Sequence, residues 1–347
     1  MKTNNKTIVF RCDFGSKFGL GHLMRCIALS EELQKYSYIH TVCLTNHYNE
    51  KYHELLSQTA MHMIVFPENT IGLAFNLEDY ISDPTSCITL FDNYDVTFEQ
   101  MNEYKKKYQN LVAIDDLADR KFDVDLIINQ NINAENLNYK ISRDAKLLLG
   151  SRFVLLRKSI LNTRASRIKN QVFMSFGGGD IFSRIETLLK MFHEINKKLV
   201  NTVYIDFAIS SEQVLMVHPL LEALDKIKFN YISNSYDLSS SIARADFAIT
   251  AAGTTVFELA YLGVPQITLI IDENQRVTGE EINNIGIGAC LGNIDKILCS
   301  DFVGCFFEFL MNDVMKEKMS SRARTFINGE GAKEVVGELI KSYNLAA

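Results

Sequence analysis

Short β-branched segments alternate with helical patterns along most of this chain, and no other sequence feature constrains the fold as strongly. In the first half, strand-like segments lie at 7–12, 38–45, 87–92 and 111–115, and the first helical pattern spans about 22–35. Strands that are joined through helices pair in parallel, with right-handed crossovers. The pattern therefore predicts an α/β fold with a parallel sheet.

The same alternation restarts in the second half, after a polar and basic segment at about 151–171 that we interpret as a linker. From about Ile294 the pattern is helical to the end. We predict two Rossmann-like, doubly wound domains, an N-terminal one at 1–160 and a C-terminal one at 170–347, facing each other across a cleft. The later strand-like segments are 171–176, 202–209, 228–233, 246–250 and 265–271.

Composition excludes several classes of protein. Of 347 residues, 47% are hydrophobic and 22% are charged, as in globular domains, and a net charge of -6 argues against a nucleic-acid partner. No segment approaches the roughly 18 apolar residues of a membrane span, and the N-terminus carries no signal-like apolar segment. We expect a cytoplasmic protein without stable membrane association. Its seven cysteines form no C-x-x-C pair, so we predict neither disulfides nor a metal site.

The first glycine-containing loop leads from a strand that ends near Cys12 to a helix that starts beside Gly21. Free N–H groups at a helix start bind anions, and Gly19 and Gly21 let a ligand approach the backbone. The helix dipole disfavours a charged imidazole, so we expect His22 to be neutral and able to accept a proton. A tight turn with a structural histidine is the alternative. Met24 replaces the third glycine of a dinucleotide-binding motif, which argues against that function.

Two further loops in the second half have similar chemistry. The segment SFGGGD contains Gly177 and Gly178 after a strand, without the lysine of an ATP-binding loop. Gly253, Thr254 and Thr255 open a helix after a buried strand, and their N–H groups and hydroxyls could hold a diphosphate. A flexible turn and an ordinary N-cap are the alternatives.

Acidic side chains follow two predicted strands of the first half. The segment 92–94 is Asp-Asn-Tyr, and Asp115 and Asp116 follow the next strand. Ligand sites of α/β folds lie at the carboxyl ends of strands. Both segments could face the cleft or serve only loop structure.

The motifs above belong to a longer set of segments, R-x-D-x5-G-x-G-H-x-x-R from Arg11, FDNYD, AIDDLADR, DLIINQN, LLLGSRFVLLR, MSFGGGD and DENQ. Taken together, these segments resemble the UDP-sugar hydrolase family of the pseudaminic acid pathway. They occur in the order of that family across roughly 7–290, and the combination is more specific than any single glycine loop. The resemblance implies a GT-B type fold and release of UDP from UDP-2,4-diacetamido-2,4,6-trideoxy-β-L-altropyranose, with no cofactor and no metal.

The resemblance also implies roles for individual residues. His22 would be the base that activates water for attack at the anomeric carbon, with Tyr94 and Asn274 in the same pocket and Glu258 on the ribose. At Asn93 a known branch of the family carries histidine. The full set of expected substrate-binding residues is Asp13, Gly19, Gly21, Arg25, Gly177, Gly178, Gly253, Thr254, Thr255, Glu258 and Gln275.

Two other functions stay open on the sequence. A GT-B glycosyltransferase would use the same UDP-binding loops but give the sugar to an acceptor. A non-catalytic sensor of nucleotide-sugars, or a scaffold, would keep its function without His22. In all three cases the expected partner is a small UDP-sugar, and we expect a monomer.

Overall fold

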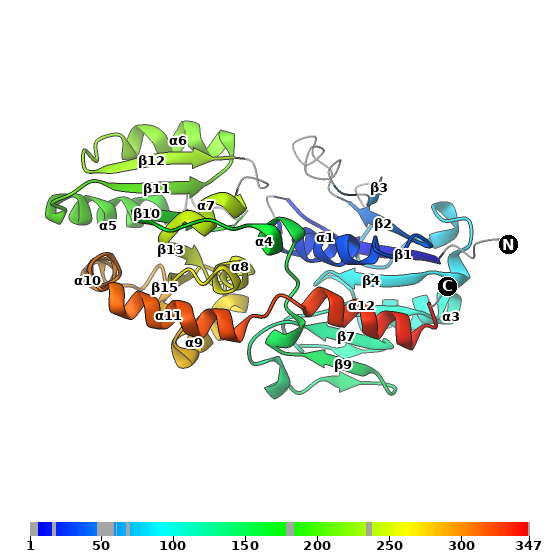
Figure 1. The fold of residues 1–347 in the computed structure, drawn as a ribbon. Helices are drawn as coiled ribbons and strands as arrows, with labels where there is room; N and C mark the ends of the chain where they lie inside the picture. Colours follow the sequence, from blue (N-terminus) through cyan, green and yellow to red (C-terminus); the bar gives the residue numbers. More distant parts are fainter. Residues whose placement is uncertain are drawn as a thin grey trace. The chain divides into compact units, whose positions relative to one another are not determined.

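The computed structural model describes residues 6–15, 19–46, 59, 61–66, 70–177, 184–233 and 238–345. The chain forms two compact units (Figure 1). Unit 1 comprises Met1–Lys158 and Gly329–Ala347, and unit 2 comprises Ser159–Asn328. Within the described part of the chain, no helix is long and apolar enough to cross a membrane.

Unit 1 is built on a parallel sheet with the strand order β3-β2-β1-β4-β5-β7-β9. Its β-branched and aromatic strand residues, such as those of the fully buried β4, are typical of a sheet that is covered on both faces. The strands are β1 (Lys6–Cys12), β2 (Ile39–Thr45), β3 (His62–Val65), β4 (Ile88–Asp92), β5 (Leu111–Ile114), β7 (Leu126–Asn129) and β9 (Lys146–Leu149). A separate parallel pair consists of β6 (Lys121–Phe122) and β8 (Lys140–Ile141).

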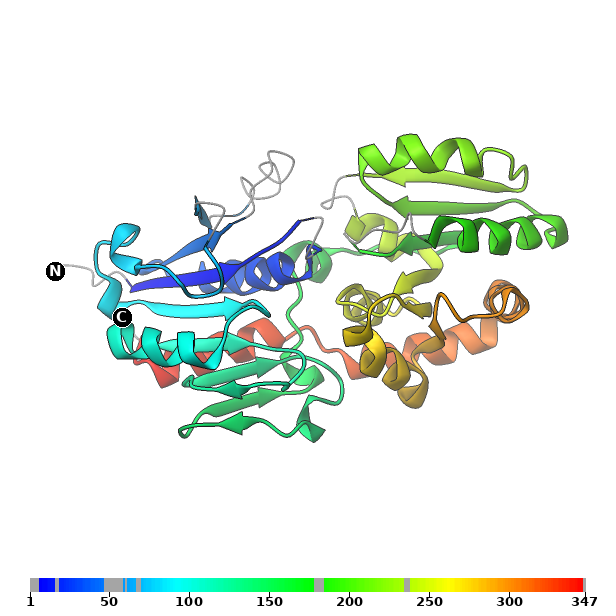
Figure 2. The same ribbon diagram turned by 180° about the vertical axis from the view of Figure 1, so that it is seen from behind.

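The helices of unit 1 include α1 (Gly21–Leu33), α3 (Phe98–Tyr108) and the last helix of the chain, α12 (Gly331–Ser342). Helix α12 packs against α1 and the short 3-10 helix η5 (Ser151–Phe153). Both views of the ribbon draw α12, in red, beside the strands of unit 1 (Figures 1 and 2). A Cβ atom at Gly331 would overlap the carbonyl oxygen of Val154, so glycine permits this close approach. Residues 329–345 thus belong to unit 1, whereas the sequence pattern had placed them in a domain at 170–347.

Unit 2 has the strand order β12-β11-β10-β13-β14-β15, the doubly wound order of a Rossmann domain. Helices α5 and α10 pack against one another and bury an apolar core with the sheet. The strands are β10 (Ile168–Ser175), β11 (Val203–Ala208), β12 (Ile227–Ile232), β13 (Ala245–Ala251), β14 (Gln266–Ile270) and β15 (Gly288–Asn293). The helices are α4 (Lys158–Asn162), α5 (Ile185–Lys198), α6 (Ser211–Leu221), α7 (Leu238–Arg244), α8 (Thr255–Leu262), α9 (Arg276–Ile285), α10 (Cys299–Met311) and α11 (Asp313–Phe326).

Both sheets are parallel and reverse their strand order next to the first strand of each unit. In unit 1, Cys12 at the end of β1 is in register with Asp92 at the end of β4. In unit 2, Ser175 at the end of β10 is in register with Thr250 on β13. These two reversal points are where α/β sheets bind ligands. The predicted α/β class with two doubly wound parallel sheets is confirmed, although β10 begins inside the segment expected to be a linker.

Candidate active site

The loop that precedes α1 is closed by its glycines. Gly15 and Gly19 exchange backbone hydrogen bonds of 3.0 and 2.7 Å, and their φ angles of 122° and 72° favour glycine. Helix α1 then begins at Gly21, with no side-chain cap on its N-terminus and no acidic residue in its first turn. The first turn therefore offers backbone N–H groups that no side chain of the helix caps.

His22 and Asp92 form a buried pair in unit 1. Nδ1 of His22 lies 2.5 Å from Oδ1 of Asp92, and the two residues are 7% and 1% exposed. Because a carboxylate only accepts hydrogen bonds, Nδ1 carries the proton that it donates to Asp92. Nη2 of Arg25 lies 3.1 Å from the same nitrogen. Because Nδ1 is protonated, it has no lone pair to accept a hydrogen bond from Arg25. Nε2 of the neutral ring is left with the lone pair that can accept a proton.

Arg25 joins two carboxylates from different strands. Its Nε and Nη2 donate to Asp92 at 2.9 and 2.7 Å, and Nη1 and Nη2 donate to Asp116 at 2.6 and 3.1 Å. Asp92 ends β4 and Asp116 follows β5, so the guanidinium fixes the spacing of neighbouring strand ends. With this pairing, Arg25 braces the His22–Asp92 pair. The sequence placed Arg25 among the substrate-binding residues, and the structure pairs it with Asp92 and Asp116.

Tyr94 and Asn131 complete the surroundings of Asp116. The Tyr94 hydroxyl donates to Asp116 at 2.6 Å, and Nδ2 of Asn131 donates to it at 3.1 Å. The Tyr94 ring meets the His22 ring edge to face, with centroids 5.0 Å apart. The structure thus brings two of the three predicted catalytic residues, His22 and Tyr94, into contact.

The charges in this cluster set its protonation. Burial lowers the pKa of His22, but the charge of Asp92 and the hydrogen bond to it outweigh burial, so the pKa is raised above its ordinary value. The sequence predicted a lowered pKa from the helix start, and the net shift of the pKa is in the opposite direction. For Asp116, burial has the opposite effect and raises the pKa, but Arg25 and Tyr94 outweigh burial and lower the pKa to about 2. The pKa of Tyr94 is raised by burial and by the Asp116 charge, which keeps its hydroxyl protonated.

Asp13, another expected substrate-binding residue, is held by protein donors. Arg11 contacts both of its oxygens at 2.7 and 3.0 Å, and Nδ2 of Asn93 donates to Oδ2 at 2.7 Å. The backbone N–H of Asn46 adds a bond of 3.0 Å. These contacts tie the ends of β1, β2 and β4 together, so in this structure Asp13 and Asn93 position the loops that surround His22.

The second glycine loop follows β10 in unit 2. Gly177 has a φ angle of 74°, and its N–H lies 3.4 Å from the Ser175 hydroxyl. Among the described residues, a Cβ atom at Gly177 would meet no other atom within 4 Å. Gly178 lies outside the described residues.

The third glycine segment links β13 to α8. Gly253, Thr254 and Thr255 are each partly exposed, and Thr254 precedes the helix without making a side-chain cap. Glu258 lies in the first turn of α8 and is half-buried. The N–H groups of Val256 and Phe257 bond to the carbonyl oxygens of Gly253 and Thr254 at 3.2 and 3.1 Å. The predicted diphosphate site at this helix start stays a prediction.

Gln275 and Asn274 lie on the short 3-10 helix η7 (Glu273–Gln275) of unit 2. Oε1 of Gln275 accepts from the N–H of Ile271 at 3.0 Å, and its Nε2 is the atom nearest to a Cβ built on Gly253, at 3.9 Å. Gln275 thus joins the loop after β14 to the α8 start. Asn274 is exposed, and its predicted place beside His22 stays a prediction.

Sequence reasoning did not assign Asp92, Asp116 or Asn131 to the site. Their signal was position, since Asp92 ends β4, and Asp116 and Asn131 follow closely on the ends of the neighbouring strands β5 and β7. Asp92 and Asp116 were noted as facing the expected cleft, but pairing them with His22 and Arg25 needs the order of the strands.

Comparison with known proteins adds a family match and two distant relatives. A family model described as Lipid-A-disaccharide synthetase matches residues 158–270, which lie almost entirely in unit 2. The chain is 24% identical over 282 residues to the pseudaminic acid cytidylyltransferase and UDP-2,4-diacetamido-2,4,6-trideoxy-beta-L-altropyranose hydrolase of Helicobacter pylori, covering 80% of this chain and 46% of that protein. It is 21% identical to the uncharacterized protein MJ1062 of Methanocaldococcus jannaschii, covering 76% of this chain and 55% of that protein. The chain thus spans about half the length of these relatives.

Solved structures share the fold over nearly whole chains. The Staphylococcus aureus MnaA–UDP structure superimposes with a TM-score of 0.69 at 13% identity, covering 99% of this chain and 98% of the other. Acinetobacter baumannii MurG superimposes with a TM-score of 0.67 at 14% identity, covering 97% of this chain and 99% of the other. The UDP-GlcNAc 2-epimerase of Neisseria meningitidis, bound to UDP-GlcNAc, superimposes with a TM-score of 0.63 at 12% identity, covering 96% of this chain and 100% of the other. The chain therefore has the GT-B type of fold found in glycosyltransferases and epimerases.

Proposed function

We propose that this chain is a nucleotide-sugar hydrolase that releases UDP from UDP-2,4-diacetamido-2,4,6-trideoxy-β-L-altropyranose. The observation that carries the proposal is the His22–Asp92 pair, in which Asp92 fixes Nδ1 as the donor and leaves Nε2 as the base. The similarity to the Helicobacter pylori protein, whose name includes this hydrolase activity, supports the choice of substrate.

In the proposed reaction, Nε2 of His22 takes a proton from a water molecule, and the water oxygen bonds to the anomeric carbon. The bond between that carbon and the phosphate oxygen breaks, and its electron pair leaves with UDP. The charge of Asp92 stabilises the imidazolium that forms, in keeping with the raised pKa of His22. One displacement at carbon inverts the anomeric centre.

We assign UDP to the glycine loops of unit 2. Backbone N–H groups at the α8 start would hold the diphosphate, and Gly177 would let it approach β10. Glu258 would accept hydrogen bonds from the ribose hydroxyls. The match of the Lipid-A-disaccharide synthetase model at 158–270 covers Gly177 and Glu258, so it supports the same loops.

The test is turnover of the UDP-sugar in ¹⁸O-labelled water, followed by phosphorus NMR and mass spectrometry. We expect wild type to release UDP and to place the label on the sugar, with and without EDTA. His22→Ala should lower the rate by about 10²–10⁴-fold, as loss of a general base does. Label on phosphate would contradict attack at carbon, and undiminished turnover by His22→Ala would contradict the assigned base.

A GT-B glycosyltransferase is the second candidate, favoured by the synthetase model that matches unit 2. It would bind the UDP-sugar but release UDP only after an acceptor is added. If wild type binds the substrate without turning it over, a screen of acceptors replaces the hydrolase assay, and the hydrolase proposal falls.

A further inference from the structure

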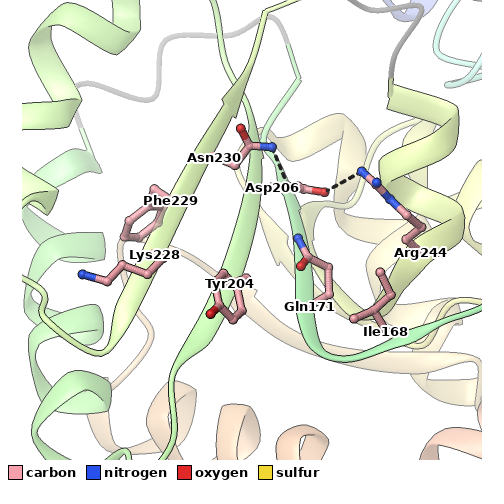
Figure 3. Close-up of a pocket in the computed structure, with 8 residues that line it drawn as sticks. All are labelled: Ile168, Gln171, Tyr204, Asp206, Lys228, Phe229, Asn230 and Arg244. Atoms are coloured by element: carbon pink, nitrogen blue, oxygen red, sulfur yellow. Dashed lines mark hydrogen bonds and ion pairs between the residues drawn. The ribbon is translucent and has the colours of Figure 1, made fainter.

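A hollow of about 300 Å³ lies on the sheet of unit 2, over β10, β11 and β12 (Figure 3). We call it the β11 hollow. It is centred on the first part of the strands, because Tyr204 is the second residue of β11 and Lys228 the second of β12. The glycine loops of unit 2 follow the other ends of their strands. The residues that line the β11 hollow are Ile168, Gln171, Tyr204, Asp206, Lys228, Phe229, Asn230 and Arg244.

Strand register arranges these polar side chains in two rows. Gln171, Tyr204 and Lys228 are in register across the three strands, and Asp206 is in register with Asn230 in the next row. Because side chains alternate along a strand, residues 204 and 206 point to the same face of the sheet. Arg244 comes from the end of α7 and reaches Asp206 from the side (Figure 3).

Asp206 is the unusual member of the β11 hollow. It is only 2% exposed, in the middle of a parallel sheet where apolar residues are the rule. Oδ1 accepts from Nδ2 of Asn230 at 2.8 Å, whereas Oδ2 lies 3.6 Å from Nη2 of Arg244 and accepts no hydrogen bond from the described residues. Nε of Arg244 is also buried and, within the same described residues, unpartnered.

Asp206 and Arg244 thus form a long ion pair, and within the described residues one oxygen of the carboxylate and one N–H of the guanidinium have no hydrogen-bond partner. Leaving a buried hydrogen-bonding group without a partner carries a free-energy cost, which is larger when the group is charged. A ligand that donates to Asp206 and accepts from Arg244 would remove this cost. Hydroxyl groups do both, and neighbouring hydroxyls can serve two partners at once.

The remaining lining selects among ligands with hydroxyl groups. Tyr204 is 53% exposed and its side chain combines an apolar ring with a polar tip, while Gln171 and Asn230 add planar amide groups. A free phosphate would place its charge against the Asp206 carboxylate. We propose that the β11 hollow binds a saccharide, whose adjacent hydroxyls bond to Asp206 and Arg244 while its C–H face rests on Tyr204. This site is separate from the proposed hydrolase site and does not depend on it.

The test is saturation-transfer NMR on the full chain with N-acetylglucosamine, glucose and cellobiose, each with and without saturating UDP. We expect at least one of them to bind with a Kd of about 1 mM, a value typical of a few hydrogen bonds. Binding should persist with UDP and weaken at least about tenfold in Asp206→Asn and Arg244→Gln. Asp225→Asn is the matched control, since this carboxylate in the same unit bonds to Asn196 and does not line the hollow.

Arg244→Gln keeps the proposal testable should Asp206→Asn fail to fold, because the Arg244 side chain is 43% exposed. Three results would overturn the proposal. These are no binding of any of the three sugars, equal affinity in Arg244→Gln and wild type, and displacement of the sugar by UDP. The first would mean that water alone satisfies Asp206 and Arg244.

Discussion

Asp92 Oδ1 lies 2.5 Å from Nδ1 of His22, although the two residues are 70 positions apart in the sequence. The carboxylate has two effects on the imidazole. It selects the tautomer with the proton on Nδ1, and it raises the pKa of the ring against the opposing effect of burial. Asp92, the last residue of β4, therefore sets both the orientation and the basicity of the proposed base.

Replacing Asp92 by asparagine should change the pH profile as well as the rate. The base works as neutral imidazole, so turnover rises as the pH rises through the pKa of His22. Removing the Asp92 charge lowers that pKa, so the acidic limb of the profile should move to lower pH. The plateau rate should fall, by up to about 10⁴-fold if the tautomer is lost.

The measurement is kcat/KM against pH for wild type and Asp92→Asn, with circular dichroism to check folding. Asp119→Asn, an exposed carboxylate beside Arg120, is the control and should leave the profile unchanged. An acidic limb that stays in place would show that Asp92 does not set the pKa of the base.

Arg25→Gln should destabilise unit 1, because two buried carboxylates lose their shared partner. Breaking such a buried pair costs about 3–5 kcal/mol. Arg152→Gln removes an exposed contact with Glu334 and should cost less than about 1 kcal/mol. Urea unfolding at pH 7 measures both free energies of unfolding, and equal losses would contradict the bracing role of Arg25.

The loss in Arg25→Gln should also depend on pH. Burial is the largest single effect on the folded-state pKa of Asp116 and raises it. The charge and hydrogen bonds of Arg25, together with Tyr94, outweigh burial and lower this pKa to about 2, below the ordinary value of an aspartate. The stabilisation is therefore complete above about pH 4 and is lost as the pH falls toward 2. Unfolding free energies of wild type and Arg25→Gln should converge over that window.

Glu258→Gln should weaken UDP binding without affecting the His22 cluster. Removing the charge from a hydrogen bond to ribose should raise the Kd about tenfold, or about 1.4 kcal/mol. Isothermal titration calorimetry with UDP measures the change. Glu186→Gln, an exposed first-turn glutamate of α5 in the same unit, is the control. An unchanged Kd in Glu258→Gln would remove this residue from the UDP site.

Lys316→Met tests a buried ion pair of unit 2 that no functional proposal uses. Nζ of Lys316 lies 2.6 Å from Asp246, and its side chain is 3% exposed, so the pair joins α11 to β13. Leaving Asp246 buried without this partner should cost about 3–5 kcal/mol in urea unfolding. Lys169→Met, which removes an exposed partner of Asp313, should cost less than about 1 kcal/mol. Activity per folded molecule should stay unchanged, and lost activity in folded Lys316→Met would contradict a purely structural role.

Local patterns in the sequence were sufficient for much of the fold. The β-branched segments at 87–92 and 246–250 became β4 and β13, and the glycine and histidine at 21–22 became the start of α1. Such features depend on residues that are near one another in the chain, so periodicity and turn chemistry predict them. Strands β3 and β9 were not among the segments that the sequence pattern predicted.

The sequence by itself determined two parallel α/β sheets, glycine loops after their strands and a histidine at a helix start, because each is encoded within a few consecutive residues. The tertiary structure alone decided that Asp92 pairs with His22, that Arg25 braces Asp92 and Asp116, and that α12 joins unit 1. The physical reason is that strand order and helix packing bring distant segments together. Those contacts depend on burial and side-chain fit over the whole unit, and no local pattern specifies them.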